Sequence, residues 1–272
     1  MLFAIDFDGT LLDPSGVVTP RTKAAIHALV EAGHHVVFAT GRSWNESKAV
    51  LEQAEHHATA VFTGGAMTID LATDEVIDRQ TMPANVAIEA CELLESLDLT
   101  PIVHQDRTLG GVDFIYGPRH APEPVLHWHR MHRLIVRMTD DWRGVNHAAT
   151  LRVTALGPTE QIDSAQRALE ALGPDRAFAY QVDLANLGVR LLEAFGPGVT
   201  KWTAIERLAT KLGIDNADII AIGDDSNDLQ MIDNAGRGVA MGNAKPHVKA
   251  AADETIGPNS ADGLAAFLEQ FA

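Results

Sequence analysis

Short apolar runs that end in polar residues recur along this chain, with helix-like segments between them. Leu2–Ile5, His35–Ala39 and Ile219–Ile222 have the length of buried strands, and Ala60–Phe62 begins another. Such alternation predicts a parallel sheet with right-handed crossovers. Ligands bind at the carboxyl edge of sheets of this kind. We therefore expect an α/β domain whose site lies where these runs end.

The alternation is interrupted in the middle of the chain and resumes after Gly196. The interrupting segment combines helix patterns with strand patterns that suit an antiparallel sheet. Helices are predicted over 84–97 and Glu160–Leu172. Strands are predicted within Pro101–Tyr116 and over Thr150–Leu156, Ala177–Val182 and Gly188–Ala194. The predicted fold is α/β: a Rossmann-like parallel-sheet core domain (1–82 and 195–272) interrupted by an α/β cap domain (83–194) with a mainly antiparallel sheet. A length of 272 residues is near the size at which chains divide into two domains.

Four helices of the core domain are predicted by their periodicity. They are Pro20–Ala32, with Thr19 as N-cap and Gly33 as a stop, Trp44–Gln53, Lys201–Leu212 and Leu229–Ala235. A strand pair with a turn at Thr73-Asp74 is expected within 66–82, a strand over Gly238–Met241 and a closing helix over Gly263–Phe271.

The charge of the chain limits its partners. The formal net charge is −16, which repels nucleic acid and acidic membranes, and no apolar run approaches the roughly 20 residues of a membrane helix. An anionic substrate remains compatible, because a metal and a few basic residues can reverse the sign locally. Cys91 is the only cysteine, which excludes an intrachain disulfide, and together with the lack of an export signal this predicts a cytoplasmic protein. Monomer and homodimer both remain open.

Two carboxylates follow the first apolar run, in Asp6-Phe7-Asp8-Gly9-Thr10. Carboxylates this close repel each other unless a cation lies between them or one is protonated. A Mg²⁺ site is the simplest explanation, with one acid left to attack and one to move a proton. A plain turn is the alternative, since Asp and Gly are common turn residues.

Three further polar segments lie at predicted strand ends or helix starts. They are Thr40-Gly41-Arg42, Gly198-Val199-Thr200-Lys201 and Gly223-Asp224-Asp225-Ser226-Asn227-Asp228. Together with Asp6–Thr10, in this order, the four segments resemble the motifs of the haloacid dehalogenase-like superfamily of phosphatases. The insert between the second and third motifs resembles the cap of the Cof-type (IIB) branch, and Val239–Ala244 is similar to the segment after its fourth motif.

This resemblance implies a division of chemical labour. Asp6 is the implied nucleophile, which forms an aspartyl-phosphate that water then hydrolyses, and Asp8 is the implied general acid and base. Lys201 is expected to pair with the phosphoryl group and Asp6, rather than to be a solvated helix lysine. Phosphoryl transfer needs such positive charge because phosphate monoesters repel nucleophiles.

The cofactor implied by the resemblance is Mg²⁺, which prefers oxygen ligands. Asp6 and Asp224 are the expected carboxylate ligands, with the backbone carbonyl of Asp8, and Asp228 is expected to act as an outer or water-mediated ligand. For Asp225 two readings remain open, a ligand or an exposed acid.

Phosphate binding is assigned to residues that can donate hydrogen bonds. Thr40 offers a hydroxyl and Gly41 a backbone N–H, and Asn227 is expected to bond phosphate or the loop that bears the ligands. Arg42 either contacts substrate or forms a surface ion pair. Relatives commonly carry Asn where this chain has Gly64, which leaves substrate preference open.

The cap is expected to close over the core site and to recognise the leaving group. Its candidate readers are Arg107, Arg119, His129, Arg152 and Asn186. His127, His129 and His132 have a spacing that can bind a transition metal, but surface or substrate-facing histidines are favoured, since no Cys or HExxH pattern accompanies them.

These features together predict an enzyme, a Mg²⁺-dependent phosphatase that hydrolyses small, sugar phosphate-like metabolites. One alternative is a phosphotransferase or phosphomutase on the same scaffold. A catalytically silent binding protein is the other, and the intact Asp6, Asp8, Lys201, Asp224 and Asp228 argue against it.

Overall fold

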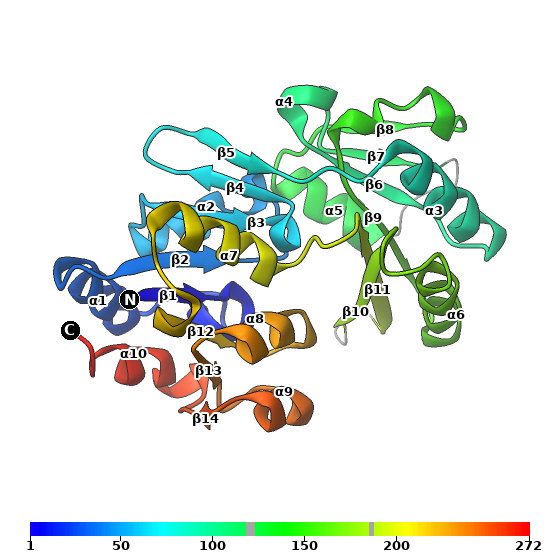
Figure 1. Cartoon of the computed structure of the whole chain (residues 1–272). Helices are drawn as coiled ribbons and strands as arrows, with labels where there is room; N and C mark the ends of the chain where they lie inside the picture. Colours follow the sequence, from blue (N-terminus) through cyan, green and yellow to red (C-terminus); the bar gives the residue numbers. More distant parts are fainter. Residues whose placement is uncertain (118–122, 185–187) are drawn as a thin grey trace. The chain divides into compact units, whose positions relative to one another are not determined.

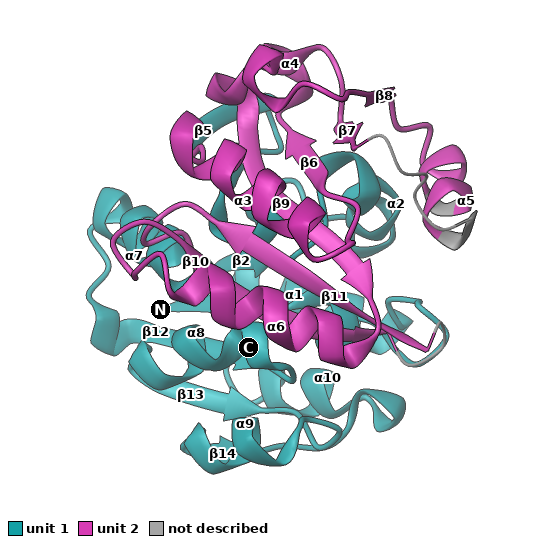
Figure 2. Ribbon diagram, turned by 90° about the vertical axis from the view of Figure 1, so that its right-hand side faces the viewer, with its two compact units in different colours: residues 1–79, 200–272 teal, residues 80–199 magenta. Residues whose placement is uncertain are grey.

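The structure is a computed structural model, and it describes residues 1–117, 123–184 and 188–272. The chain forms two compact units, drawn in separate colours in Figure 2. Unit 1 comprises residues 1–79 and 200–272, from both ends of the chain, and unit 2 comprises residues 80–199. No helix among the described residues is long and apolar enough to cross a membrane.

Unit 1 contains an eight-stranded sheet (Figure 1). Its strands, in spatial order, are β14 (Glu254–Thr255), β13 (Arg237–Ala240), β12 (Ile219–Gly223), β1 (Leu2–Ile5), β2 (His35–Ala39), β3 (Thr59–Phe62), β4 (Met67–Asp70) and β5 (Glu75–Arg79). The first six are parallel, and the β4–β5 hairpin adds an antiparallel edge. β1 lies between β12 and β2, which places the carboxyl ends of three predicted strands side by side.

Helices cover both faces of this sheet. They are α1 (Pro20–Glu31), α2 (Trp44–Ala54), α7 (Lys201–Leu212), α8 (Leu229–Asn234), α9 (Pro246–Ala251) and α10 (Gly263–Leu268). Leu2 and Ala4 of β1 join the core formed with α7 and α8, including Ile205 and Met231. Phe3, which points to the other face, packs against Phe271, just after α10, with the ring centroids 5.2 Å apart. Strands buried on both faces explain the unbroken apolar runs.

Local signals at the helix starts act as predicted. The Thr19 side chain accepts a hydrogen bond from the Thr22 N–H at 3.1 Å, and Pro20 takes the first helical position. Thr200 caps α7 in the same way, accepting from the Thr203 N–H at 3.2 Å. This cap fixes the first residue of the helix, Lys201, at the sheet edge.

Unit 2 is a second α/β unit with a six-stranded sheet. Its strands, in spatial order, are β10 (Phe178–Leu184), β11 (Val189–Phe195), β9 (Thr150–Gly157), β6 (Ile102–Gln105), β7 (Phe114–Tyr116) and β8 (Val136–Met138). All neighbours pair antiparallel except β7 and β8. The helices are α3 (Ala84–Ser96), α4 (Arg107–Gly110), α5 (Glu123–Met131) and α6 (Thr159–Glu170). Figure 2 shows α3 and α6 on one face of this sheet, where they bury the larger core of the unit.

The predicted fold class is confirmed: a parallel-sheet core with a second, mainly antiparallel sheet. Some short elements were not predicted. The β8 strand and the β14 strand have three and two residues, too few to form a periodic pattern, and α9 has six. The predicted strand pair within Pro101–Tyr116 exists, but the one-turn helix α4 lies between its strands.

Candidate active site

Three carboxylates of unit 1 meet at the carboxyl edge of the parallel sheet. Asp6 follows β1, and Asp224 and Asp228 follow the neighbouring strand β12. Each of the three offers an oxygen, and these oxygens lie within 4.8 Å of one another. Asp6 and Asp228 are buried and Asp224 is half-buried. Three carboxylates this close together and largely buried need a positive charge nearby to offset their repulsion.

Lys201 supplies a positive charge from the first turn of α7. Its Nζ donates to Asp6 Oδ1 at 2.6 Å and to Asp228 Oδ1 at 2.7 Å. The Lys201 side chain is only 1% exposed, which rules out the reading of a solvated helix lysine. The two carboxylates raise the pKa of Lys201 above its ordinary value, against the opposing effect of burial, so the amine is charged.

Asp228 uses both of its carboxylate oxygens within the protein. Oδ1 accepts from Lys201, and Oδ2 accepts from the backbone N–H groups of Asp224 and Asp225 at 3.0 and 3.1 Å. Asp228 thus holds the loop that carries Asp224 and also orients Lys201.

Burial and neighbouring acids destabilise the charged forms of Asp6 and Asp224. Burial raises the pKa of Asp6, and the charge of Asp228 raises it further, while Lys201 opposes both. Burial, together with Asp228 and Asp225, raises the pKa of Asp224 to about 7. Asp224 Oδ1 is buried and has no hydrogen-bond partner among the described residues. A divalent cation beside these oxygens would offset the repulsion and satisfy the orphaned atom.

The turn after β1 depends on one glycine. Residues Phe7–Leu11 form a wide turn with non-helical backbone angles at Asp8 and at Gly9, where φ is +81°. A Cβ on Gly9 would lie 2.1 Å from Asp224 Oδ2, so any other residue would displace that carboxylate. The plain-turn reading of Asp6–Thr10 is therefore too simple: the segment turns, and it brings its backbone against the half-buried carboxylate of Asp224.

Asp8 and Arg42 form an ion pair at the rim of the cluster. Arg42 Nε donates to Asp8 Oδ2 at 2.8 Å, and a second guanidinium nitrogen, Nη2, contacts Asp8 Oδ1. The Asp8 side chain is 57% exposed. Of the two readings for Arg42, the structure shows an ion pair, and its partner is the acid expected to move a proton.

The second predicted motif folds back on itself. The Thr40 hydroxyl accepts from the Arg42 N–H at 3.1 Å, and the Thr40 carbonyl accepts from the Gly64 N–H at 3.0 Å. Gly41 lies between Thr40 and Arg42 in the chain. The structure thus brings Thr40, Gly41 and Arg42 together beside the end of β3, next to Gly64.

The fourth motif contributes two residues whose roles were open. Asp225 pairs with Lys245 at 2.6 Å and caps the short turn Ser226–Asp228, so this conformation uses it to hold the loop. Asn227 is half-buried, and its Oδ1 atom has no hydrogen-bond partner in the described part of the chain.

Sequence reasoning assigned no role to Asn243, although its segment was singled out. Asn243 follows β13, and its Nδ2 donates to the Gly9 carbonyl at 2.8 Å and to Asp224 Oδ2 at 3.3 Å. The only signal in the sequence was the likeness of Val239–Ala244 to a family segment. The contact forms because the loop after β13 lies against the turn that follows β1.

The candidate readers in unit 2 mostly have partners within that unit. Arg107 forms an ion pair with Asp113, and Arg152 forms a buried ion pair with Glu193. His129 was expected at the surface or against substrate, but it is 5% exposed. It stacks on Phe114 with centroids 4.5 Å apart and hydrogen-bonds Tyr116, with Nδ1 2.7 Å from the hydroxyl oxygen. Arg119 and Asn186 lie outside the described residues.

The histidines of unit 2 do not form a metal site with one another in the described residues. The acid cluster of unit 1 is the one group of potential metal ligands found there. His127 is exposed and His132 is half-buried.

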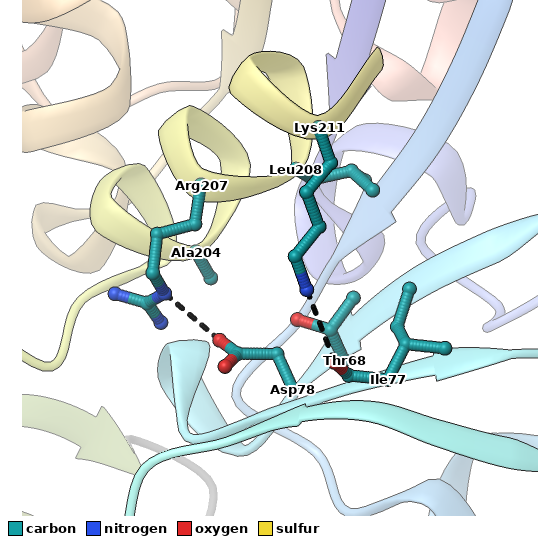
Figure 3. Close-up of a pocket in the computed structure, with 7 residues that line it drawn as sticks. All are labelled: Thr68, Ile77, Asp78, Ala204, Arg207, Leu208 and Lys211. Atoms are coloured by element: carbon teal, nitrogen blue, oxygen red, sulfur yellow. Dashed lines mark hydrogen bonds and ion pairs between the residues drawn. The ribbon is translucent and has the colours of Figure 1, made fainter.

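A small pocket of unit 1 lies away from the acid cluster, between the β4–β5 hairpin and α7 (Figure 3). It is lined by Thr68, Ile77, Asp78, Ala204, Arg207, Leu208 and Lys211. Arg207 pairs with Asp78 at 2.8 Å, and Lys211 donates to the Ile77 carbonyl at 3.1 Å. The pocket has no room for a water molecule. The contacts of Arg207 and Lys211 attach the β4–β5 hairpin to α7.

Curated proteins of similar sequence are phosphatases. HMP-PP phosphatase of Serratia proteamaculans is 30% identical over 91% of this chain and 86% of that protein. The 5-amino-6-(5-phospho-D-ribitylamino)uracil phosphatase YitU of Bacillus subtilis is 27% identical over 99% and 97%. Pyridoxal phosphate phosphatase YbhA of Escherichia coli is 25% identical over 98% and 97%. These relatives confirm the predicted enzyme class, a hydrolase of phosphoric monoesters.

Solved structures share the fold over the whole chain. A haloacid dehalogenase-like hydrolase from Bacteroides thetaiotaomicron superposes with a TM-score of 0.81 at 23% identity, covering 100% of this chain and 99% of that one. The subclass IIB sugar phosphatase BT4131 gives 0.80 at 21% identity, over 99% and 98%. A family model described as haloacid dehalogenase-like hydrolase matches residues 3–268. By its motifs, its fold and this match, the chain belongs to the haloacid dehalogenase-like hydrolases.

Proposed function

We propose that this chain is a Mg²⁺-dependent phosphatase that hydrolyses small phosphorylated metabolites through an aspartyl-phosphate on Asp6. The observation that carries the proposal is the buried Lys201, shared between Asp6 and Asp228, with Asp224 in the same cluster. An ammonium and three carboxylates at one strand edge fit the transfer of a charged phosphoryl group.

The residues present fit a Mg²⁺ ion. Asp6 and Asp224 would hold it, with the backbone carbonyl of Asp8, while Asp228 would hold the ligand loop from behind. The partnerless Oδ1 of Asp224 and the raised pKa of both ligand acids support this, because a hard cation prefers carboxylate oxygens and stabilises their charged form. When bound, Mg²⁺ would neutralise part of the negative charge of the phosphoryl group.

The side chains then divide the reaction. An oxygen of Asp6 forms a bond to phosphorus as the bond to the leaving oxygen breaks, and Asp8 gives that oxygen a proton. Water next attacks the aspartyl-phosphate, with Asp8 taking the proton of the water, which releases phosphate and restores Asp6. Lys201 holds Asp6 in place and counters the developing charge.

Phosphate oxygens would be bound by donors around the cluster. We assign this role to the Thr40 hydroxyl, the Gly41 N–H and Asn227, together with Lys201. Arg42 pairs with Asp8, so we assign to it the orientation of that acid, and contact with the substrate in addition.

The proposed substrates are small phosphorylated metabolites. The relatives are named for HMP-PP, a ribitylaminouracil phosphate and pyridoxal phosphate, each small. A substrate panel should therefore combine such compounds with the sugar phosphates expected from the sequence. We propose neither nucleic acid nor membrane as a partner, and both monomer and homodimer fit. A phosphomutase and a silent binding protein are the competing functions.

The test is phosphate release from this panel with Mg²⁺ and with EDTA. Asp6→Asn should abolish release, while Asp233→Asn, an exposed acid on α8, should leave it unchanged. Acid quenching with labelled substrate should trap phosphate on the wild type and not on Asp6→Asn. Transfer of phosphate to a second site of the substrate would indicate a mutase. Binding of the panel compounds without turnover would indicate a silent binder.

A further inference from the structure

We infer that Asn243 is a positioning residue for Asp224: it fixes one oxygen of that carboxylate and leaves the other for the cation. The inference rests on the proposed function, because it concerns the ligand set of the proposed Mg²⁺ site. It assigns a task to a residue outside the four motifs.

One amide group, that of Asn243, donates to two acceptors. Asn243 Nδ2 lies 2.8 Å from the Gly9 carbonyl oxygen and 3.3 Å from Asp224 Oδ2. One NH₂ group thus bridges the turn that follows the nucleophile and a ligand on the neighbouring strand. Gly9 permits this, since a Cβ there would lie 2.1 Å from the same Asp224 oxygen.

The oxygen end of the Asn243 amide is also fixed. Asn243 Oδ1 accepts from the Asn259 N–H at 2.9 Å, and Asn259 Nδ2 donates to the Leu12 carbonyl at 2.7 Å. The orientation of the Asn243 amide is therefore determined, with its NH₂ directed at Gly9 and Asp224. Asn243 and Asn259 thus connect their own loops, and the loop of Asp224, to the segment that carries Asp6 and Asp8.

The two carboxylate oxygens of Asp224 have different surroundings. Oδ2 faces Asn243, whereas Oδ1 is buried without a partner among the described residues. The Asp224 backbone carbonyl also accepts from the Lys245 N–H at 3.0 Å, so the 243–245 segment holds both main chain and side chain. Because Asn243 holds Oδ2, the partnerless Oδ1 is the oxygen left to bind a cation at the acid cluster.

A residue that served only to stabilise the fold would lower the free energy of unfolding when it is removed, with no specific effect on metal affinity. Asn243 is exposed, so its hydrogen bonds compete with water and contribute little to global stability. Loss of an outer residue that orients a ligand typically lowers metal affinity about 10- to 100-fold. The inference therefore predicts weakened metal binding with almost unchanged folding.

The experiment is calorimetric titration of the full-length protein with MgCl₂, with no substrate present. Asn243→Ala should raise the Mg²⁺ Kd about tenfold, with a urea midpoint close to that of the wild type. The matched control is Asn234→Ala, which removes an exposed asparagine whose Nδ2 donates to the Gln230 carbonyl at 2.7 Å on α8. Its Kd should equal that of the wild type. In turnover assays, saturating Mg²⁺ should restore kcat of Asn243→Ala to within a few-fold.

Each outcome decides the matter. A wild-type Kd in Asn243→Ala, while the wild type binds Mg²⁺ and releases phosphate, overturns the inference and leaves the proposed function intact. Lower kcat that excess Mg²⁺ does not restore, with an unchanged Kd, also overturns it. If the wild type neither binds Mg²⁺ nor releases phosphate, the proposed function and this inference are rejected together.

Discussion

Lys201 and Asp6 are separated by 195 positions in the sequence, yet Lys201 Nζ lies 2.6 Å from Asp6 Oδ1, and their side chains are only 1% and 6% exposed. The contact joins the first strand to the first turn of α7, from the part of the chain that follows unit 2. A buried charge pair of this kind links the stability of the fold to the chemistry of the site.

The first prediction concerns Lys201 itself. Lys201→Met should destabilise the metal-free protein by about 3 kcal/mol or more, because Asp6 and Asp228 lose their cation in a buried site. Phosphate release should fall by at least about 1,000-fold, as the transition state loses a positioned charge. Urea unfolding and the release assay measure the two effects.

Lys211→Met is the matched control for this change. Lys211 lies on the same helix but is exposed, and it donates only to a backbone carbonyl of the hairpin. Its substitution should change the stability by less than about 0.5 kcal/mol. Equal effects of the two substitutions would show that Lys201 does not compensate the buried acids.

The second prediction concerns the close approach of Gly65 to the start of α7. Gly65 has φ +107°, and a Cβ there would lie 2.0 Å from the Thr200 carbonyl oxygen. Gly65→Ala should cost about 2 kcal/mol or more, from backbone strain and the displaced helix start, and should lower turnover by moving Lys201. Thermal melts and kcat provide the readouts.

Gly33→Ala separates strain from collision. Gly33 also has a positive φ, +84°, but nothing lies within 4 Å of its Cβ position. It should cost only about 1 kcal/mol and leave kcat unchanged. If Gly33→Ala were as harmful as Gly65→Ala, the contact with Thr200 would be unimportant.

The third prediction links metal binding to pH. Burial and neighbouring acids raise the pKa of Asp224 to about 7, so a proton must leave before the carboxylate can bind a cation. The apparent Mg²⁺ affinity should therefore rise as pH increases toward 7 and level off above it. Below pH 7 the slope should be about tenfold per pH unit for one proton.

The same shift has a consequence for the metal-free protein. Because the folded-state pKa of Asp224 is higher than its unfolded value, the group favours folding at low pH. That contribution is lost as pH rises from about 4 through 7. Asp224→Asn should remove this pH dependence and most of the Mg²⁺ affinity; a steep dependence that survives the substitution would assign it to another group.

The fourth prediction concerns a histidine outside the site. His56 is buried against Phe38, with ring centroids 4.4 Å apart, and burial lowers its pKa to about 4. The unfolded chain binds a proton near pH 6.5, so stability should decrease as pH falls from 6.5 toward 4, by roughly 3 kcal/mol in total. His56→Phe should flatten this part of the profile, and His57→Phe, at an exposed neighbour, should not. Urea midpoints measured across this pH range provide the data.

Much of the fold follows from local patterns in the sequence. The strand Leu2–Ile5, the N-cap Thr19 and the helix start at Lys201 are all where periodicity and capping place them. These features succeed because a buried strand must be apolar and a helix must satisfy its first N–H groups, whatever surrounds them. Short elements such as β8 and α9 lack such a signal, since their conformation depends on the neighbours they pair with.

Strand and helix periods and the order of the motifs are properties of the chain, and they were enough to predict the fold class and the residues that gather at the strand ends. How these residues pair with one another became visible in the folded protein. The structure showed that Arg42 pairs with Asp8, that Asp225 holds Lys245, and that Asn243 reaches Asp224. Hydrogen bonds and ion pairs between distant segments form only where donor and acceptor lie within a few tenths of an ångström of the right separation. Those distances are set by the packing of β1, β12 and α7, and no local pattern in the sequence encodes them.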